Sequence, residues 1–176
     1  MSYISKGPAK GEDWEYKLYF DPDSDDPSVS PHKRIKPWEL MSKLKGLVGI
    51  DEKIDFVTIC KEPLYEWQFT QYFMYHMYVV FKTENWMWTI EKHSDGITLQ
   101  RSKSLIVTEK YRRHHLRKSV RERLMSDGGR ISVHQLIEWL SDNDQLKQKY
   151  CYIFSNCKDF AREVFNRVAK FQRIFW

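Results

Sequence analysis

Apolar and polar positions alternate most regularly between residues 72 and 108, where short segments are separated by turn-forming residues. The predicted strands of this region are Tyr72–Thr83, Trp86–Glu91, Ile97–Arg101 and Leu105–Thr108. Glu84 and Asn85 form a tight turn between the first two strands. Asp95 and Gly96 are a dipeptide that favours a hairpin before the third strand. The pattern therefore predicts an antiparallel meander.

The sequence before the meander predicts an arm, a helix and one further strand. The elements are a polar, turn-rich arm over residues 1–36 with a short strand at Trp14–Phe20, a helix that starts at Pro37 and ends at Gly46 and Gly49, and a strand over Lys53–Cys60. Ile54, Phe56 and Thr58 share one face of that strand, and Pro63 ends it.

The chain after the meander is mainly helical. The elements are a basic helix over Glu109–Met125 ended by Gly128 and Gly129, a helix from Ser132 to about Leu140, an extended segment over Tyr150–Phe154, and a last helix that begins at Asn156 or Cys157. Ser132 and Gln135 match a capping box. The last helix has an apolar face with a period of 3.6, formed by Phe160, Ala161, Val164, Phe165 and Val168. The fold class is therefore α+β, an antiparallel sheet packed with helices, with residues 37–176 as a single domain.

The composition is typical of a globular protein and indicates which cellular compartment the protein occupies. The chain has 176 residues, of which 41% are hydrophobic and 30% charged. No apolar stretch is long enough to cross a bilayer, and the N-terminus lacks the apolar run of a signal peptide. The three cysteines, Cys60, Cys151 and Cys157, form no CxxC pair, so we expect no metal site and no cofactor. Free thiols favour a reducing compartment, so we expect a cytoplasmic protein, with the nucleus or a host-cell interior as alternatives.

The formal net charge of +5 is concentrated in one segment. Its basic patch consists of Arg112, Arg113, Arg117, Lys118 and Arg121, together with Lys110 and Arg123. A solvated helix face explains such a patch most simply. The alternative is a surface that binds nucleic acid, anionic lipid or an acidic protein partner.

Cys157 is the strongest candidate for chemistry. Asn156 is a favourable N-cap, which puts Cys157 at the first helical position. The free amides and the dipole of a helix start stabilise a thiolate there, and the positive charge of Lys158 adds to this effect. The same amides could hold the oxyanion of a tetrahedral intermediate. The competing interpretation is a small core residue, which also applies to Cys60 and Cys151.

His76 is the best candidate for the base that a nucleophilic thiol needs. It lies on the strongest predicted strand, and a two-residue turn at 84–85 puts His93 opposite it on the next strand. Residues opposite each other on antiparallel strands point to the same face. His93 could therefore orient His76 as the third member of a triad, and Glu91 or Gln100 could do the same. The histidines show no HExxH spacing, which disfavours a metal-dependent enzyme.

Asn156, Cys157 and Phe160, at the start of an amphipathic helix after an aromatic segment, resemble the NC box of lecithin retinol acyltransferase-like proteins. They also resemble the cysteine motif of the PPPDE peptidases, which remove ubiquitin-like modifiers. His76 is similar to the strand histidine of either family, and histidine precedes cysteine as in both. Two departures separate the chain from the acyltransferases: Met77 and Tyr78 replace their Trp-Gly, and their second histidine comes sooner than His93 does. The resemblance implies a circularly permuted papain-like fold of the NlpC type.

The expected function is that of a cysteine-dependent hydrolase or acyl-transfer enzyme. Cys157 would form a thioester with an isopeptide, peptide or lipid ester substrate, and His76 would act as the base. The alternative is a non-enzymatic interaction module that uses the basic helix over residues 110–123 to bind nucleic acid or an acidic partner.

Overall fold

The computed structural model describes residues 16–23, 25, 26, 28, 33–63, 75–103, 122–151 and 156–171. The protein has an α+β fold with a seven-stranded mixed sheet and three helices among these residues. The strands are β1 (Leu18–Asp21), β2 (Lys33–Ile35), β3 (Phe56–Pro63), β4 (Tyr75–Lys82), β5 (Met87–His93), β6 (Gly96–Ser102) and β7 (Glu122–Gly128). The α-helices are α1 (Lys45–Val48), α3 (Val133–Asp142) and α4 (Cys157–Val168); a short 3₁₀ helix, η1 (Pro37–Glu39), and a π-helix, η2 (Leu40–Leu44), precede α1.

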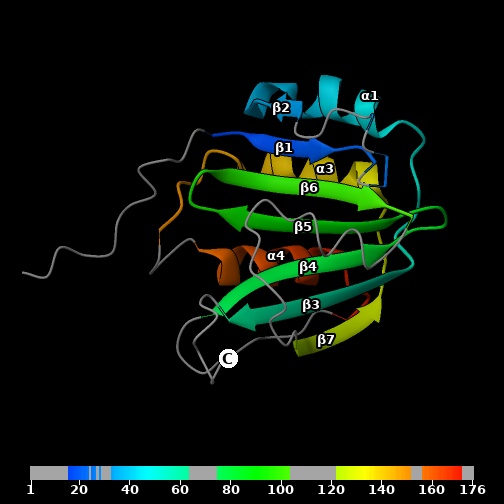
Figure 1. Cartoon of the computed structure of the whole chain (residues 1–176), viewed down its shortest axis with the longest axis vertical. Coiled ribbons are helices and arrows are strands. Elements are labelled where there is room, and N and C mark those ends of the chain that lie inside the picture. The colour runs from blue at the N-terminus through cyan, green and yellow to red at the C-terminus, as the bar shows by residue number, and fades with distance from the viewer. Residues whose placement is uncertain are drawn as a thin grey trace, which may run out of the picture.

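The antiparallel meander is confirmed in β4, β5 and β6 (Figure 1). The two-residue turn at 84–85 sets the register between β4 and β5, so that Tyr78 lies opposite Glu91. The N–H of Thr83 donates to the carbonyl of Trp86 over 2.9 Å and closes this turn. The hairpin between β5 and β6 places His93 opposite Gly96, also as the sequence predicts.

The sheet extends beyond the meander on both sides, in the order β2-β1-β6-β5-β4-β3-β7. Residues 18–21 and 33–35, which fall in the predicted arm, form β1 and β2. Leu18, Phe20 and Ile35 are fully buried in the core, which explains why this part of the chain joins the sheet. Since β1 pairs with β6 in parallel, the sheet is mixed and not purely antiparallel as predicted.

The face of β3 that carries Phe56 and Thr58 is not the one that packs into the main core. Val57 and Ile59 are fully buried, whereas the side chain of Phe56 is 47% exposed. Val57 pairs with Phe81 and Ile59 with Val79, so the register with β4 turns these residues toward the core. Because side chains alternate along a strand, Phe56 must then point away from the core.

The predicted helix over 109–125 is wrong at its C-terminal end, because residues 122–125 belong to β7, an edge strand paired with β3. Gly129 follows β7 and does not end a helix. A Cβ atom at Gly129 would lie 2.0 Å from the carbonyl oxygen of Ile54, so only glycine permits this approach of two backbones. The rest of the predicted helix, with Arg112, Arg113, Arg117, Lys118 and Arg121, lies outside the described residues.

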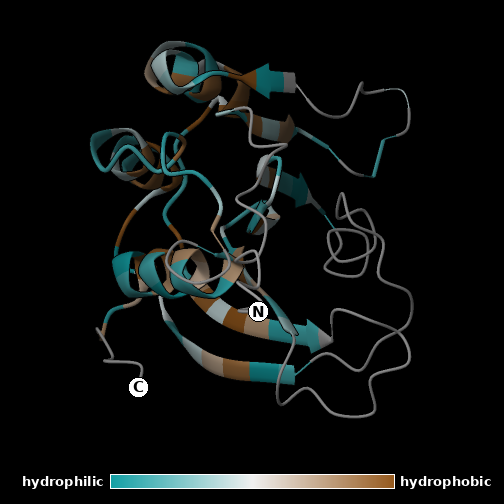
Figure 2. Ribbon diagram, turned by 90° about the vertical axis from the view of Figure 1, so that its left-hand side faces the viewer, coloured by the Kyte–Doolittle hydropathy of each residue, from teal (hydrophilic) through white to brown (hydrophobic). Residues whose placement is uncertain are grey.

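Helices α3 and α4 pack on one face of the sheet, and the edge-on view shows the helices together on that side (Figure 2). The capping box of α3 is confirmed, since the Ser132 side chain accepts the Gln135 N–H and Gln135 reaches back to the Ser132 backbone. The apolar face predicted for the last helix is also confirmed, because all five of its residues are buried against the sheet. No helix in the described part of the chain is long and apolar enough to cross a membrane.

Candidate active site

Cys157 is the first residue of α4, as the sequence predicts. The Asn156 side chain caps this helix by accepting the N–H groups of Lys158 at 2.8 Å and Asp159 at 3.3 Å. Asp159 in turn accepts the Asn156 N–H at 3.4 Å, which completes a capping box. The thiol therefore lies where the helix dipole favours negative charge.

The surroundings of Cys157 favour its thiolate. Burial of the side chain, which is 4% exposed, by itself raises the pKa of the thiol. Hydrogen bonds from His76, from the Met77 N–H and from Tyr150 oppose this effect, and the pKa is lowered overall. The Tyr150 hydroxyl donates to the sulfur over 3.8 Å.

His76, near the start of β4, is the side chain that faces this sulfur. Its Nε2 lies 2.8 Å from a carboxylate oxygen of Glu91 on β5, so we assign the other ring nitrogen, Nδ1, to Cys157. Burial lowers the pKa of His76, but hydrogen bonds to Cys157 and Glu91 outweigh burial and raise it to about 10. The contact between the two side chains thus raises the pKa of the imidazole and lowers that of the thiol, and both shifts favour a thiolate–imidazolium pair.

Glu91 is the direct partner of His76, and His93 is the next residue beyond it. His93 Nε2 lies 3.1 Å from the same Glu91 oxygen, and the His93 ring stacks on His76 with centroids 4.9 Å apart. Burial raises the pKa of Glu91, but the two imidazoles hold it well below its ordinary value. The predicted register thus brings His93 beside His76, while the hydrogen bond to His76 comes from Glu91, one of the alternatives that the sequence left open.

The site is therefore a chain of four contacting side chains, Cys157, His76, Glu91 and His93, drawn from α4 and two neighbouring strands. All four are less than a tenth exposed. Low solvent access strengthens each interaction between charged groups. Such an arrangement supplies a nucleophile, an acid–base group and a carboxylate that fixes the orientation of the imidazole.

The same residues also bear on metal binding. Ligand atoms of His76, Glu91 and His93 lie within 4.8 Å of one another. Ligands of one zinc ion, with bonds of about 2.0–2.2 Å, would stand more than 3 Å apart in tetrahedral geometry. Because His76 Nε2 and the Glu91 oxygen are 2.8 Å apart, their contact is that of a hydrogen bond.

The other predicted site residues take different positions. The ammonium of Lys158 lies over the Tyr75 ring, 3.9 Å from its centroid. Cys60 is buried in β3 and packs with Tyr78 and Val80. Cys151 forms no disulfide bond and is partly exposed. Tyr150 belongs to the site but was not predicted, because no local pattern ties it to Cys157.

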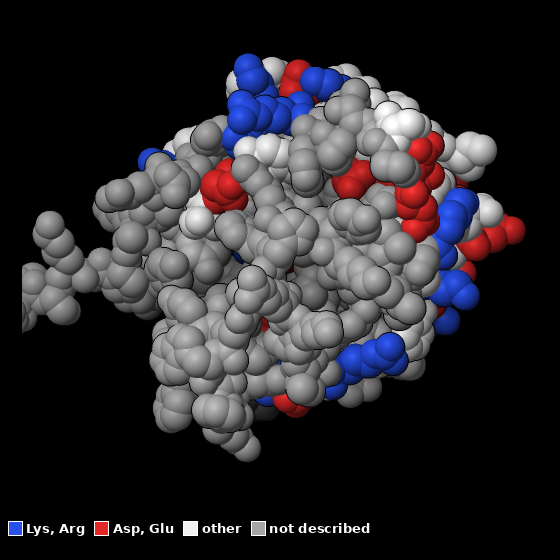
Figure 3. Space-filling view, viewed as in Figure 1, with Lys and Arg blue, Asp and Glu red and all other residues white. Residues whose placement is uncertain are grey.

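The structure does not test the predicted basic patch. Its five defining residues lie outside the described ranges. On the face shown in Figure 3, acidic and basic side chains of the described residues lie beside one another.

No family model, no curated protein and no solved structure matches the chain.

Proposed function

We propose that the protein is a cysteine-dependent hydrolase or acyl-transfer enzyme of the circularly permuted papain-like group. The observation that carries this proposal is the buried contact between Cys157 and His76, with Glu91 bonded to the far side of the imidazole. A structural cysteine requires neither a lowered pKa nor a charged partner. The strand histidine precedes the helix-start cysteine, as the motif resemblance of Asn156, Cys157 and Phe160 implies.

The reaction begins with attack of the Cys157 sulfur on the carbonyl carbon of the substrate. The bond to the leaving amine or alcohol breaks, and His76 transfers its proton to that group. His76, now neutral, takes a proton from water or from another acceptor, which attacks the thioester and regenerates the thiolate. Glu91 stays ionised throughout and stabilises the imidazolium form of His76.

The donors for the oxyanion differ from those expected at a free helix start. The N–H groups of Lys158 and Asp159 already donate to the Asn156 side chain. The backbone amide of Cys157 and the hydroxyl of Tyr150 are therefore the donors that we assign to the oxyanion. Tyr150 contacts the sulfur directly, so it is close to the carbon that the sulfur attacks.

Alkylation with iodoacetamide near neutral pH tests the proposal, because Cys60 and Cys151 serve as internal references in the same molecule. We expect Cys157 to react faster than both by at least about tenfold, since an ordinary thiol is only a few per cent ionised at this pH. His76→Gln should remove most of this difference. Rates are read for each cysteine by peptide mass spectrometry. A Cys157 that reacts no faster than the other two would contradict the proposal.

The proposed chemistry is compatible with three substrate types, and a separate assay tests each of them. A ubiquitin-like modifier with a C-terminal fluorogenic amide represents isopeptides, a fluorogenic tripeptide represents peptides, and a phospholipid in micelles represents lipid esters. Turnover of any one that is lost in Cys157→Ala assigns the class.

A further inference from the structure

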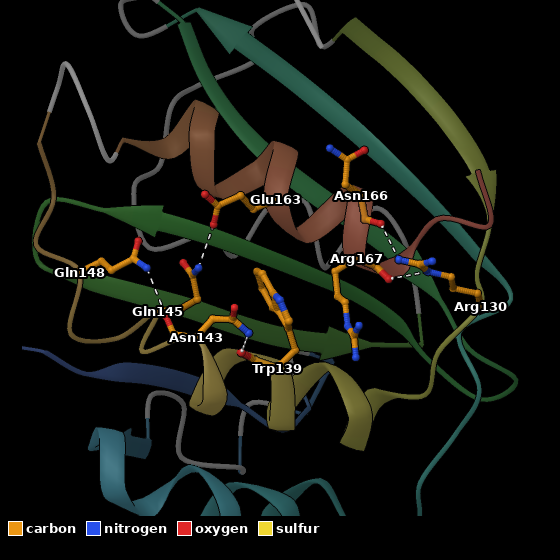
Figure 4. Close-up of a pocket in the computed structure, with 8 residues that line it drawn as sticks. All are labelled: Arg130, Trp139, Asn143, Gln145, Gln148, Glu163, Asn166 and Arg167. Atoms are coloured by element: carbon orange, nitrogen blue, oxygen red, sulfur yellow. Dashed lines mark hydrogen bonds between the residues drawn. The ribbon is translucent and has the colours of Figure 1, made fainter. Parts of the chain in front are cut away.

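A groove with polar walls lies between α3 and the C-terminal half of α4, on the helix side of the sheet (Figure 4). Its volume is about 460 Å³, within the range of small-ligand sites. The side chains that matter for the argument are Arg130, Trp139, Gln145, Glu163, Asn166 and Arg167. Cys157 begins α4 and does not line this groove, so the groove is separate from the candidate active site.

Hydrogen bonds join the walls of the groove at both ends. At one end the Gln145 side chain donates to Glu163 over 2.8 Å, which joins the turn after α3 to α4. At the other end Arg130 donates to the carbonyls of Arg167 at 3.0 Å and Asn166 at 3.1 Å. A groove whose walls are joined at both ends suits a small molecule better than a peptide that must run through it.

Arg167 and Trp139 lie between these ends. Figure 4 shows the two side chains side by side, Arg167 extending from α4 and Trp139 from α3, both directed into the groove. The Nε atom of Arg167 is buried and has no hydrogen-bond acceptor among the described residues. Buried donors without an acceptor are rare in proteins, and an arginine fork fits the oxygens of a phosphate.

The other charges favour an anion as well. Arg130 is held at the end of α4. Among the described residues that line the groove, Glu163 alone carries a carboxylate, and Gln145 donates a hydrogen bond to it. The indole of Trp139 offers an aromatic surface beside the guanidinium. The side-chain amides of Asn143 and Gln148 also line the groove and can bond the polar edge of a planar ring.

We propose that this groove binds a small phosphate-bearing molecule with a planar ring, of the nucleoside monophosphate class. The phosphate accepts hydrogen bonds from Arg167, and the ring lies against Trp139. The site is independent of Cys157 chemistry and goes beyond the proposed function.

Calorimetric titration of the full chain with adenosine, guanosine, cytidine and uridine monophosphates tests this proposal. We expect saturable binding of at least one nucleotide, and weaker binding of the matching nucleoside and of inorganic phosphate. Arg167→Gln should weaken binding at least tenfold, Arg167→Lys should weaken it less, and Trp139→Leu should reduce it toward that of phosphate alone. Thermal melts check that each variant is folded.

Arg162→Gln is the matched control, because Arg162 lies on the same helix, faces Asp159 and does not line the groove; its affinity should be unchanged. Cys157→Ser should also bind normally, which separates this test from that of the thiol chemistry. Absence of saturable binding by every nucleotide, or equal affinity in Arg167→Gln, would overturn the proposal. Phosphate that binds as tightly as every nucleotide would overturn the role of Trp139.

Discussion

At the scale of single residues, the charge on His76 depends on the groups on either side of it. Cys157 faces one side of the imidazole and Glu91 the other, and both stabilise its protonated form. An imidazolium in turn stabilises the thiolate, so the three groups titrate as a coupled set. A change at Glu91 should therefore reach the sulfur, although Glu91 contacts His76 and not the reacting atoms.

Glu91→Gln tests this dependence, because it removes the negative charge and keeps the shape of the side chain. The pKa of His76 should fall and that of Cys157 should rise, so alkylation of Cys157 near neutral pH should slow several-fold to tenfold. The profile of rate against pH, measured by mass spectrometry, should shift toward higher pH.

Glu62→Gln is the control, since Glu62 lies opposite His76 on the other neighbouring strand, β3. This substitution also replaces a carboxylate by an amide, but it keeps the Glu91 carboxylate that is hydrogen-bonded to His76 Nε2. An equal shift in both variants would show that overall charge, and not the Glu91 contact, sets the profile.

The sequence predicts which residues meet here better than it predicts how they bond. Turn length sets the register of β4 and β5, which is why His76 and His93 could be expected on one face. Register does not determine side-chain rotamers, so the choice between His93 and Glu91 as the partner of His76 remained open. Tyr150 could not be found, because the path from Tyr150 to Cys157 depends on tertiary packing.

At the scale of elements, α4 carries Cys157 on its capped first turn, and the cap gives the next prediction. Asn156→Ala should destabilise the protein by about 1 kcal/mol and should also slow the alkylation of Cys157, because the first turn then loses the side chain that fixes its amides. Urea denaturation and labelling rates measure the two effects.

Ser132→Ala removes the equivalent cap from α3 and is the matched control. It should cost a similar amount of stability, but it should leave the reactivity of Cys157 unchanged. If both variants slow labelling equally, lost stability and not the local turn is responsible.

Helices and strands can be predicted from the sequence where the local pattern and the tertiary environment favour the same structure. The apolar period of α4 and the capping box of α3 are local features, and both were found. The segment Glu122–Met125 contains good helix formers, yet it forms a strand because β3 offers it backbone hydrogen bonds along one edge. That edge exists only in the folded sheet, so the local sequence of Glu122–Met125 does not predict the strand.

At the scale of the whole molecule, the buried pair couples stability to pH. The pKa of His76 is raised from 6.5 to about 10 on folding, so its contribution is complete below pH 6.5 and is lost as the pH rises through about 10. The pKa of Cys157 is lowered from 9.0, so its contribution is complete above pH 9.0 and is lost as the pH falls. From pH 6.5 to 9.0, the His76 contribution falls while that of Cys157 rises, and the two changes oppose each other.

Above pH 9.0 only the His76 contribution still changes, so the pair should lose stability as the pH rises toward about 10. His76→Gln removes the His76 contribution and the largest part of the Cys157 contribution, because Cys157 then loses the cation that does most to lower its pKa. Since lysines and tyrosines also titrate in this range, the quantity to compare is the difference in unfolding free energy between the wild type and His76→Gln. We expect this difference to decrease from pH 9 to pH 10 in urea titrations at constant ionic strength. A difference that stays constant over this interval would mean that His76 is neutral in the folded protein, and the thiolate–imidazolium pair would then be wrong.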